Sequence, residues 1–379
     1  MWLRRLALLA VCAALTVPLF VTTIPPLLDY PNHLARMAVL AAGGHDADLA
    51  RIYAIDWHLA PNLGMDLVVP LLAQIMPLVL AGKIFLALAL ILPLLGTVAL
   101  HDAVFEKRSY WPLASAIVVF NAALLAGFLN FAVGIGLAML GTACWLRLRH
   151  DVRWQLPAGA LIVAVLFFVH AFAAAFLLMM IAVFELREGR RTQNNARARR
   201  VAKLGLVALP AAVLYLQTWF AGVVASPLTL TGTLWSTQAT FDTFHKAIGA
   251  AASFFTYDTG SDLLILIAVT AALAALSLAR KLAFAWPITI ALVLMLAYPF
   301  LPSTITGTGW LDTHLPVFAG FLLFAGITPR RLGRRETVVL GFAFAALIVA
   351  RLGVITLAWQ GQNADLANIT AVLAPVKAQ

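Results

Sequence analysis

The chain has 379 residues, of which 63% are hydrophobic and 11% are charged, and its mean hydropathy is +0.95. A soluble domain carries roughly 25% charged residues, so this composition excludes a water-soluble globular protein and predicts a polytopic membrane protein. The formal charge is +10, but the basic residues gather in alternate loops between apolar segments. This distribution indicates membrane topology and argues against nucleic acid as a partner. Cys12 and Cys144 lie within apolar runs, where they indicate neither a disulfide nor a metal site.

Apolar segments of about 20 residues, the length that spans a bilayer as a helix, follow one another along the chain. We therefore predict an all-α fold, a single integral membrane domain over residues 1–379 with about 11 transmembrane or half-membrane helices. The first segment follows Arg4 and Arg5 and is long enough to span, so we interpret it as an uncleaved helix. The predicted apolar segments are 6–24, 67–100, 112–126, 129–146, 156–184, 204–224, 263–279, 283–301, 315–327 and 338–359.

The positive-inside rule sorts the loops between these segments. Six stretches hold 20 basic and 6 acidic residues and are expected in the cytoplasm with the N-terminus: 1–5, 101–111, 147–153, 185–203, 280–281 and 330–336. The remaining loops are acidic, and 29–66, 225–262 and 302–314 are expected on the outer face. This pattern is typical of a multi-pass protein of the bacterial inner membrane.

The same sorting has consequences for two long segments. Residues 67–100 can cross only once, so the first third is expected to lie along or dip into the outer face. Residues 156–184 have basic loops on both sides and must return to the side they left. At about 1.5 Å per residue they are expected to form two half-helices that turn near His170. One long crossing helix is the alternative.

A cluster of polar side chains directly follows the first apolar segment. Asp29 is placed to act as a general base on an acceptor hydroxyl or as a metal ligand. Alternatively, it caps the helix that Pro31 helps to start. His33 and Arg36 lie about one helical turn further on. His33 is a ligand or a solvated interfacial side chain, and Arg36 binds phosphate or reaches lipid headgroups.

Asp56 and His58 form a second polar group in the same loop, and their i, i+2 spacing places both on one side of an extended segment. A second carboxylate is what acid–base or divalent-metal chemistry requires. Asn130, at an outer turn, either caps its own helix or points into a cavity, and His170 has the same two interpretations.

Further candidates lie closer to the C-terminus. Arg351 is charged within an apolar run, and intramembrane charges usually face a partner or a cavity, so a lipid-linked phosphate is one candidate counter-ion. Asp312 and His314 are outward substrate-binding candidates. The chain lacks Walker, dinucleotide-binding, zinc-peptidase and serine-hydrolase motifs, so the sequence gives no support for nucleotide chemistry or peptidase activity.

Two stretches carry a family resemblance: Asp29-Tyr30-Pro31-Asn32-His33, and the run from Gly127-Phe128-Leu129-Asn130 to Gly134. Together with the uneven apolar segments and outer loops, they resemble the type C integral-membrane glycosyltransferases and uncharacterised bacterial proteins placed beside them. The resemblance implies an acidic base in the first outer loop, which Asp29 matches by position. It also implies an acidic pair, and since Tyr30 follows Asp29 here, Asp56 is the candidate second acid.

The resemblance implies transfer of a sugar from a polyprenyl-phosphate donor to a glycan or lipid acceptor on the outer face. Asp29 would deprotonate the acceptor, and Arg36, Arg351 or His314 would stabilise the departing phosphate. No cofactor is required by the sequence; Mg²⁺ or Mn²⁺ stays open, with Asp29, His33 and Asp56 as ligands. A transporter or flippase, and a non-catalytic membrane subunit, are the alternative functions, both in contact with the lipid bilayer.

Overall fold

The computed structural model describes residues 2–189, 194–222, 243–301, 310 and 312–373. About 77% of the chain is helical, which confirms the all-α class. Within the described residues, seven helices are long and apolar enough to cross a membrane, and two more apolar helices are shorter. This is the pattern of a multi-pass membrane protein, although the predicted number of about 11 segments is not confirmed.

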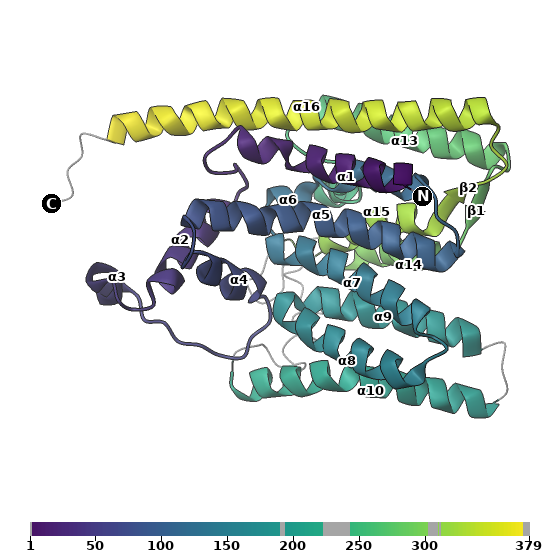
Figure 1. The fold of residues 1–379 in the computed structure, drawn as a ribbon, viewed down its shortest axis with the longest axis horizontal. Helices are drawn as coiled ribbons and strands as arrows, with labels where there is room; N and C mark the ends of the chain where they lie inside the picture. Colours follow the sequence, from purple (N-terminus) through teal and green to yellow (C-terminus); the bar gives the residue numbers. More distant parts are fainter. Residues whose placement is uncertain (1, 190–193, 223–242, 302–309, 311, 374–379) are drawn as a thin grey trace.

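The helices and the one short hairpin follow in chain order (Figure 1). The first half contains α1 (Trp2–Thr16), the 3-10 helix η1 (Val17–Phe20), α2 (Tyr30–Ala42), α3 (Ala47–Ile52), α4 (Gly64–Leu72), α5 (Leu78–Phe105), η2 (Trp111–Val118), α6 (Ala122–Leu125), α7 (Leu129–Arg147), α8 (Val152–Val169) and α9 (Ala171–Gly189). The second half contains α10 (Asn194–Phe220), α12 (Thr243–Gly249), α13 (Thr259–Leu278), β1 (Leu282–Phe284), α14 (Pro287–Ala297), η3 (Tyr298–Phe300), α15 (His314–Gly326), β2 (Ile327–Pro329) and α16 (Arg334–Leu373). The two strands pair antiparallel.

The predicted segment 67–100 crosses once, as α5, and its beginning forms the separate short helix α4. The prediction for 112–126 was wrong. This segment is a 3-10 helix followed by a single turn of α-helix, because Pro112 stands at the helix start and the Asn121 side chain caps a new helix at Leu124. This segment is nonetheless buried almost throughout, which explains its apolar composition.

The predicted turn at His170 is confirmed. His170 is extended (φ −167°, ψ 122°) and separates α8 from α9, so one continuous helix is excluded. The prediction of half-helices was wrong, because α8 and α9 have 18 and 19 residues. Both helices continue beyond the predicted apolar segment, into residues 152–155, which include Arg153, and into the charged stretch 185–189.

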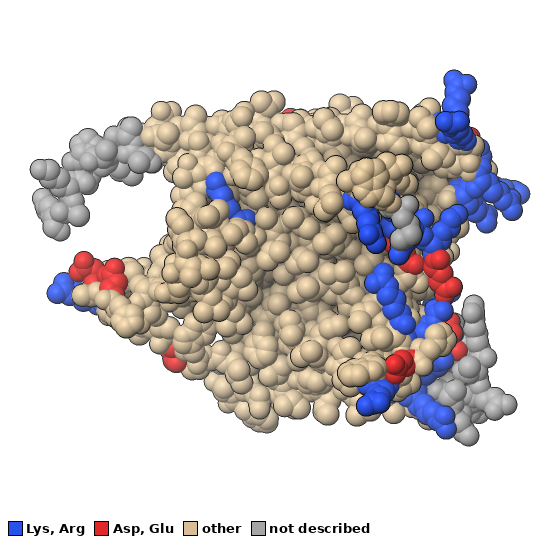
Figure 2. Space-filling view, viewed as in Figure 1, with Lys and Arg blue, Asp and Glu red and all other residues tan. Residues whose placement is uncertain are grey.

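Ion pairs gather the basic stretches at one end of the molecule, which we call the basic end. They join Arg4 to Asp102 (2.8 Å), Arg149 to Glu106 (2.7 Å), Arg200 to Glu185 (2.6 Å) and Lys281 to Glu336. Figure 2 shows most Lys and Arg at this end, and a largely uncharged middle. Helices α2, α3 and α4 lie at the opposite end (Figure 1). The loops that the structure describes therefore separate as the charge pattern predicted, whereas residues 225–242 and 302–309 of the predicted outer loops lie outside the described residues.

Two glycines bring α5 and α7 into backbone contact. A Cβ atom added to Gly136 would lie 2.4 Å from the Leu92 carbonyl carbon, and one added to Gly96 would lie 2.6 Å from the Gly136 oxygen. Small residues permit this close approach between membrane helices. The α5–α7 pair is the centre of the fold, since α4, α8, α9, α15 and η2 pack around it.

We expect Gly136→Ala to destabilise the protein by about 1–3 kcal/mol, because the added methyl group meets backbone atoms that cannot rotate away. Gly353→Ala is the matched control, since Gly353 is an exposed glycine within α16 with no neighbour inside 4 Å. Thermal unfolding in detergent measures both variants. Equal unfolding midpoints for the two would contradict the proposed role of the α5–α7 contact.

Candidate functional site

Asp29 occupies the N-cap position of α2, but its side chain makes no capping hydrogen bond. The segment before it is held by backbone contacts: the Leu28 amide donates to Leu125 O (2.8 Å) and the Asp29 amide to Ala126 O (3.3 Å). The half-buried carboxylate has no hydrogen bond or ion pair among the described residues. The capping interpretation of Asp29 therefore has no support in the geometry.

A tyrosine hydroxyl also holds this segment. Tyr257 donates to Pro26 O (2.8 Å) and accepts from Trp359 Nε1 (2.9 Å), which connects α16 to the residues preceding Asp29. Burial raises the pKa of Tyr257 to about 12, so the hydroxyl remains a donor at neutral pH. The backbone at Asp29 is thus held from two sides, whereas its carboxylate makes no hydrogen bond or ion pair with the described residues.

Gly127 packs directly against Asp29. Its φ is +97°, in the region that favours glycine, and an added Cβ would lie 2.9 Å from Asp29 Cβ and 3.0 Å from Asp29 N. The resemblance stretch that begins at Gly127 is therefore in contact with the first resemblance stretch.

We expect Gly127→Ala to destabilise the fold by about 1–3 kcal/mol and to reduce activity further, because the side chain would displace Asp29. Gly44→Ala is the matched control: Gly44 also has a positive φ (+82°) but no neighbour within 4 Å. Unfolding midpoints and the transfer assay described below measure both effects. Equal activity in the two variants would show that the contact with Asp29 is unimportant.

Two predicted histidines meet in a group of phenylalanines beside the start of α7. The rings of His170 and His314 are stacked with centroids 5.3 Å apart, and Phe131 lies 4.1 Å from His314. His314 Nδ1 is 3.1 Å from Trp310 O, whereas the buried His170 Nδ1 has no hydrogen-bond partner. Burial, and then the neighbouring His314, hold the pKa of His170 well below its usual range. His170 is therefore neutral at pH 7.

Asn130 makes contacts that sequence reasoning did not predict. Its side-chain oxygen accepts from the Met65 amide (2.8 Å), and its side-chain nitrogen donates to Asn62 O (2.6 Å). It neither caps α7 nor stands free in a cavity. Instead it fixes the start of α4, and with it the end of the first polar loop, to the start of α7.

The first polar loop and α2 enclose a cavity of about 660 Å³. Its lining includes Asn32 and Arg36 from α2, and Asp56, Trp57 and His58 from the loop. Asn32 and Arg36 follow Asp29 at helical spacings of three and seven residues, so the three side chains share one face of α2. The cavity is mostly apolar with a few polar groups, as small-molecule sites generally are.

Each charged side chain that lines this cavity has a partner. His58 Nε2 lies 2.9 Å from the Asp56 carboxylate, so the predicted common side of these residues is confirmed, and both are largely exposed. Arg36 donates through Nε to the buried carboxylate of Asp66 on α4. Asp66 was not predicted as the partner of Arg36, although an acid in the first turn of a short apolar helix is a signal that could have pointed to a charged partner.

The structure places Arg351 and Asp312 in ion pairs of their own. Arg351 donates to Asp262 (2.8 Å) and to Phe120 O and Phe254 O (2.8 and 2.7 Å), and Asp312 pairs with Lys246. All four charged side chains are buried. Asp262 was not predicted as a partner, although a buried arginine requires an acid and Asp262 begins an apolar segment.

The described residues contain no group of three His, Cys, Asp or Glu side chains that could hold a metal ion. Asp29, His33 and Asp56 are therefore not brought together as a set of metal ligands. No protein-family model, no curated protein and no solved structure matches this chain.

Proposed function

We propose that the protein transfers a sugar from a polyprenyl-phosphate donor to a glycan or lipid acceptor, as the resemblance to type C glycosyltransferases implies. The observation that carries the proposal is the Asp29 carboxylate, which makes no hydrogen bond or ion pair with the described residues. It stands at the start of α2, and the next turns of this helix line the 660 Å³ cavity. The proposal places the protein in the bacterial inner membrane, with the basic end and N-terminus in the cytoplasm and the cavity on the outer side.

In the proposed reaction, Asp29 accepts the proton of the acceptor hydroxyl. The hydroxyl oxygen forms a bond to the anomeric carbon, the bond between that carbon and the phosphate oxygen breaks, and the electron pair leaves with polyprenyl phosphate. Arg36, on the cavity wall, stabilises the charge of the departing phosphate. Asp66 holds the Arg36 guanidinium in place for this role.

Other cavity residues are suited to holding the sugar. Tyr53 and Trp57 provide aromatic surface, and Asn32, Asp56 and His58 provide hydrogen-bonding groups. Asn130 acts by positioning the loop, since its amide holds the residues that precede α4. The neutral His170 and its neighbour His314 both pack against the Phe131 ring at the start of α7.

The test uses purified protein in lipid nanodiscs with a panel of labelled polyprenyl-phosphate sugars and candidate acceptors, with and without Mg²⁺ or Mn²⁺. Release of polyprenyl phosphate together with a glycosylated acceptor is the expected result. Donor that crosses a sealed vesicle without cleavage would replace the proposal with a flippase. Absence of donor binding and cleavage across the panel would remove the transferase proposal and leave the non-catalytic subunit.

A further inference from the structure

A second cavity, of about 500 Å³, is lined by residues at the basic end, including Arg149, and shares no lining residue with the cavity next to α2. Its apolar walls come from four helices or their ends: Ala103 and Val104 on α5, Leu146 on α7, Phe184 on α9, and Trp286 at the start of α14. The rings of Phe184 and Trp286 are 6.2 Å apart. Tryptophan is enriched where membrane helices meet the headgroup layer, which is where the basic end places this cavity.

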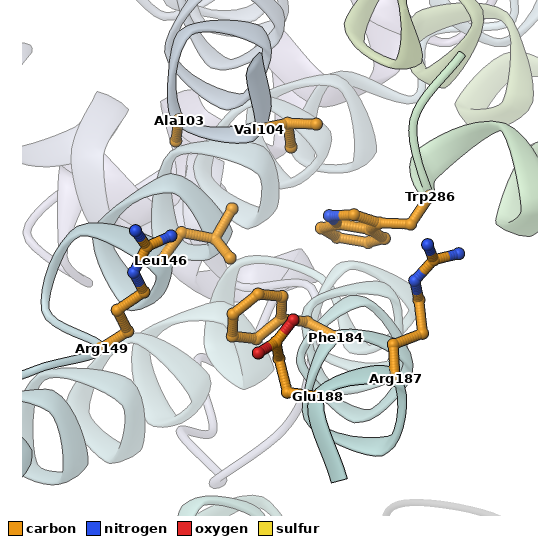
Figure 3. A pocket seen from close by; sticks show the side chains of 8 residues that line it. All are labelled: Ala103, Val104, Leu146, Arg149, Phe184, Arg187, Glu188 and Trp286. Atoms are coloured by element: carbon orange, nitrogen blue, oxygen red, sulfur yellow. The ribbon is translucent and has the colours of Figure 1, made fainter. Parts of the chain in front are cut away.

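Three charged side chains also line the cavity. Figure 3 shows Arg149 and Arg187 on opposite sides, with Glu188 and the Phe184 ring between them. Arg187 is exposed and makes no ion pair with any residue that the structure describes. Arg149 donates to Glu106 through Nη2 and to His150 through Nε, which leaves its Nη1 available. The cavity therefore offers guanidinium donors on two sides and a carboxylate between them.

Two arginines and a glutamate in one cavity favour a zwitterionic ligand, which carries an anionic and a cationic group. The guanidinium groups suit a phosphodiester, because arginine binds phosphate through charge-assisted hydrogen bonds. A purely anionic ligand would meet the Glu188 carboxylate, whereas an ammonium group can donate to it. Glu188 already interacts within the chain, and an ionised carboxylate accepts several hydrogen bonds, so both contacts are compatible.

We propose that this cavity binds the headgroup of a phosphatidylethanolamine molecule from the membrane leaflet at the basic end. Its phosphate accepts hydrogen bonds from Arg187, its ammonium group donates to the neighbouring Glu188, and its glycerol and first acyl carbons contact Leu146 and Phe184. Basic pockets between membrane helices on the cytoplasmic side are known headgroup sites in general. The site is separate from the proposed transfer reaction and does not depend on it.

The test compares phosphatidylethanolamine with phosphatidylcholine of identical acyl chains. Both carry the same net charge and phosphate, but only the ethanolamine ammonium has N–H donors. Purified full-length protein is relipidated with each lipid in turn, and the retained lipid is counted by native mass spectrometry. We expect phosphatidylethanolamine to be retained about 10-fold more strongly. Glu188→Gln should remove this preference, and Arg187→Gln should weaken retention of both lipids by a similar factor.

Arg335→Gln is the matched control, because Arg335 is an exposed arginine at the same end but outside the cavity. Equal retention of the two lipids by the native protein, stronger retention of phosphatidylglycerol, or an equal loss in Arg335→Gln would overturn the proposal. If an equal concentration of free O-phosphoethanolamine displaces the lipid, the site binds a soluble headgroup compound, and the proposal of a bound lipid is overturned. The ratio in the native protein decides the question even where a variant fails to fold.

Discussion

Asp29→Asn is expected to reduce sugar transfer by about 10²–10⁴-fold, the usual contribution of a general base, while the protein remains folded. The asparagine amide has nearly the same shape but cannot accept the proton of an acceptor hydroxyl. Because the Asp29 carboxylate makes no capping hydrogen bond, its replacement should change the unfolding midpoint little. Donor binding should also persist, so the loss should appear in kcat and not in KM.

The matched control is Asp46→Asn, in the same polar loop. Asp46 caps α3, where its side chain accepts from the amides of Asp48 (3.0 Å) and Leu49 (3.1 Å), and an asparagine can make the same bonds. Its activity should equal that of the native protein. An active Asp29→Asn variant would remove Asp29 as the base. Loss of activity in Asp56→Asn instead would move that role to the Asp56–His58 pair.

The sequence predicted those features that depend on local composition. Apolar length was sufficient to predict that α5, α13 and α16 exist, and it placed the ends of α13 closely, but α5 begins later and α16 ends later than the predicted segments. The charge on both sides of 156–184 required the turn at His170. The 3-10 stretch at Trp111–Val118 was not predicted, because a buried irregular segment and a membrane helix have the same apolar composition. Asn121, a helix-capping residue in the middle of the predicted segment 112–126, is the feature that marks the break.

Contacts between distant residues could not be predicted in the same way. Asn130 holds amide and carbonyl groups some 65 residues earlier in the chain, and Arg351 meets an acid 89 residues away. The apolar surroundings of Asn130 and Arg351 in the sequence indicate that both side chains need polar partners, but they do not identify those partners. The cavity beside α2 was foreseen only as a cluster of polar residues. Its walls depend on how the loop folds back over the helix, which no periodicity reveals.

The largest effect on stability is expected at Arg351. Arg351→Met should destabilise the protein by about 3–5 kcal/mol, because it leaves the Asp262 carboxylate buried without its counter-charge. Asp262 would keep only its bonds from Thr256, and the carbonyl groups of Phe120 and Phe254 would lose their donor. Arg351→Lys should recover little, since a single ammonium group cannot reproduce the fork of the guanidinium.

Two further measurements separate this structural role from the phosphate-binding role that the sequence suggested for Arg351. In Arg351→Met/Asp262→Leu, no charge remains unpaired, so a substantial part of the lost stability should return. Unfolding in detergent and donor affinity are measured on the single and double variants. If Arg351 instead binds the lipid phosphate, Arg351→Met should weaken donor binding at an unchanged unfolding midpoint, and removing Asp262 should restore nothing. If Asp262 is the counter-ion of Arg351, Arg351→Met should lower the unfolding midpoint, and its activity should fall only in proportion to the fraction of protein that is unfolded.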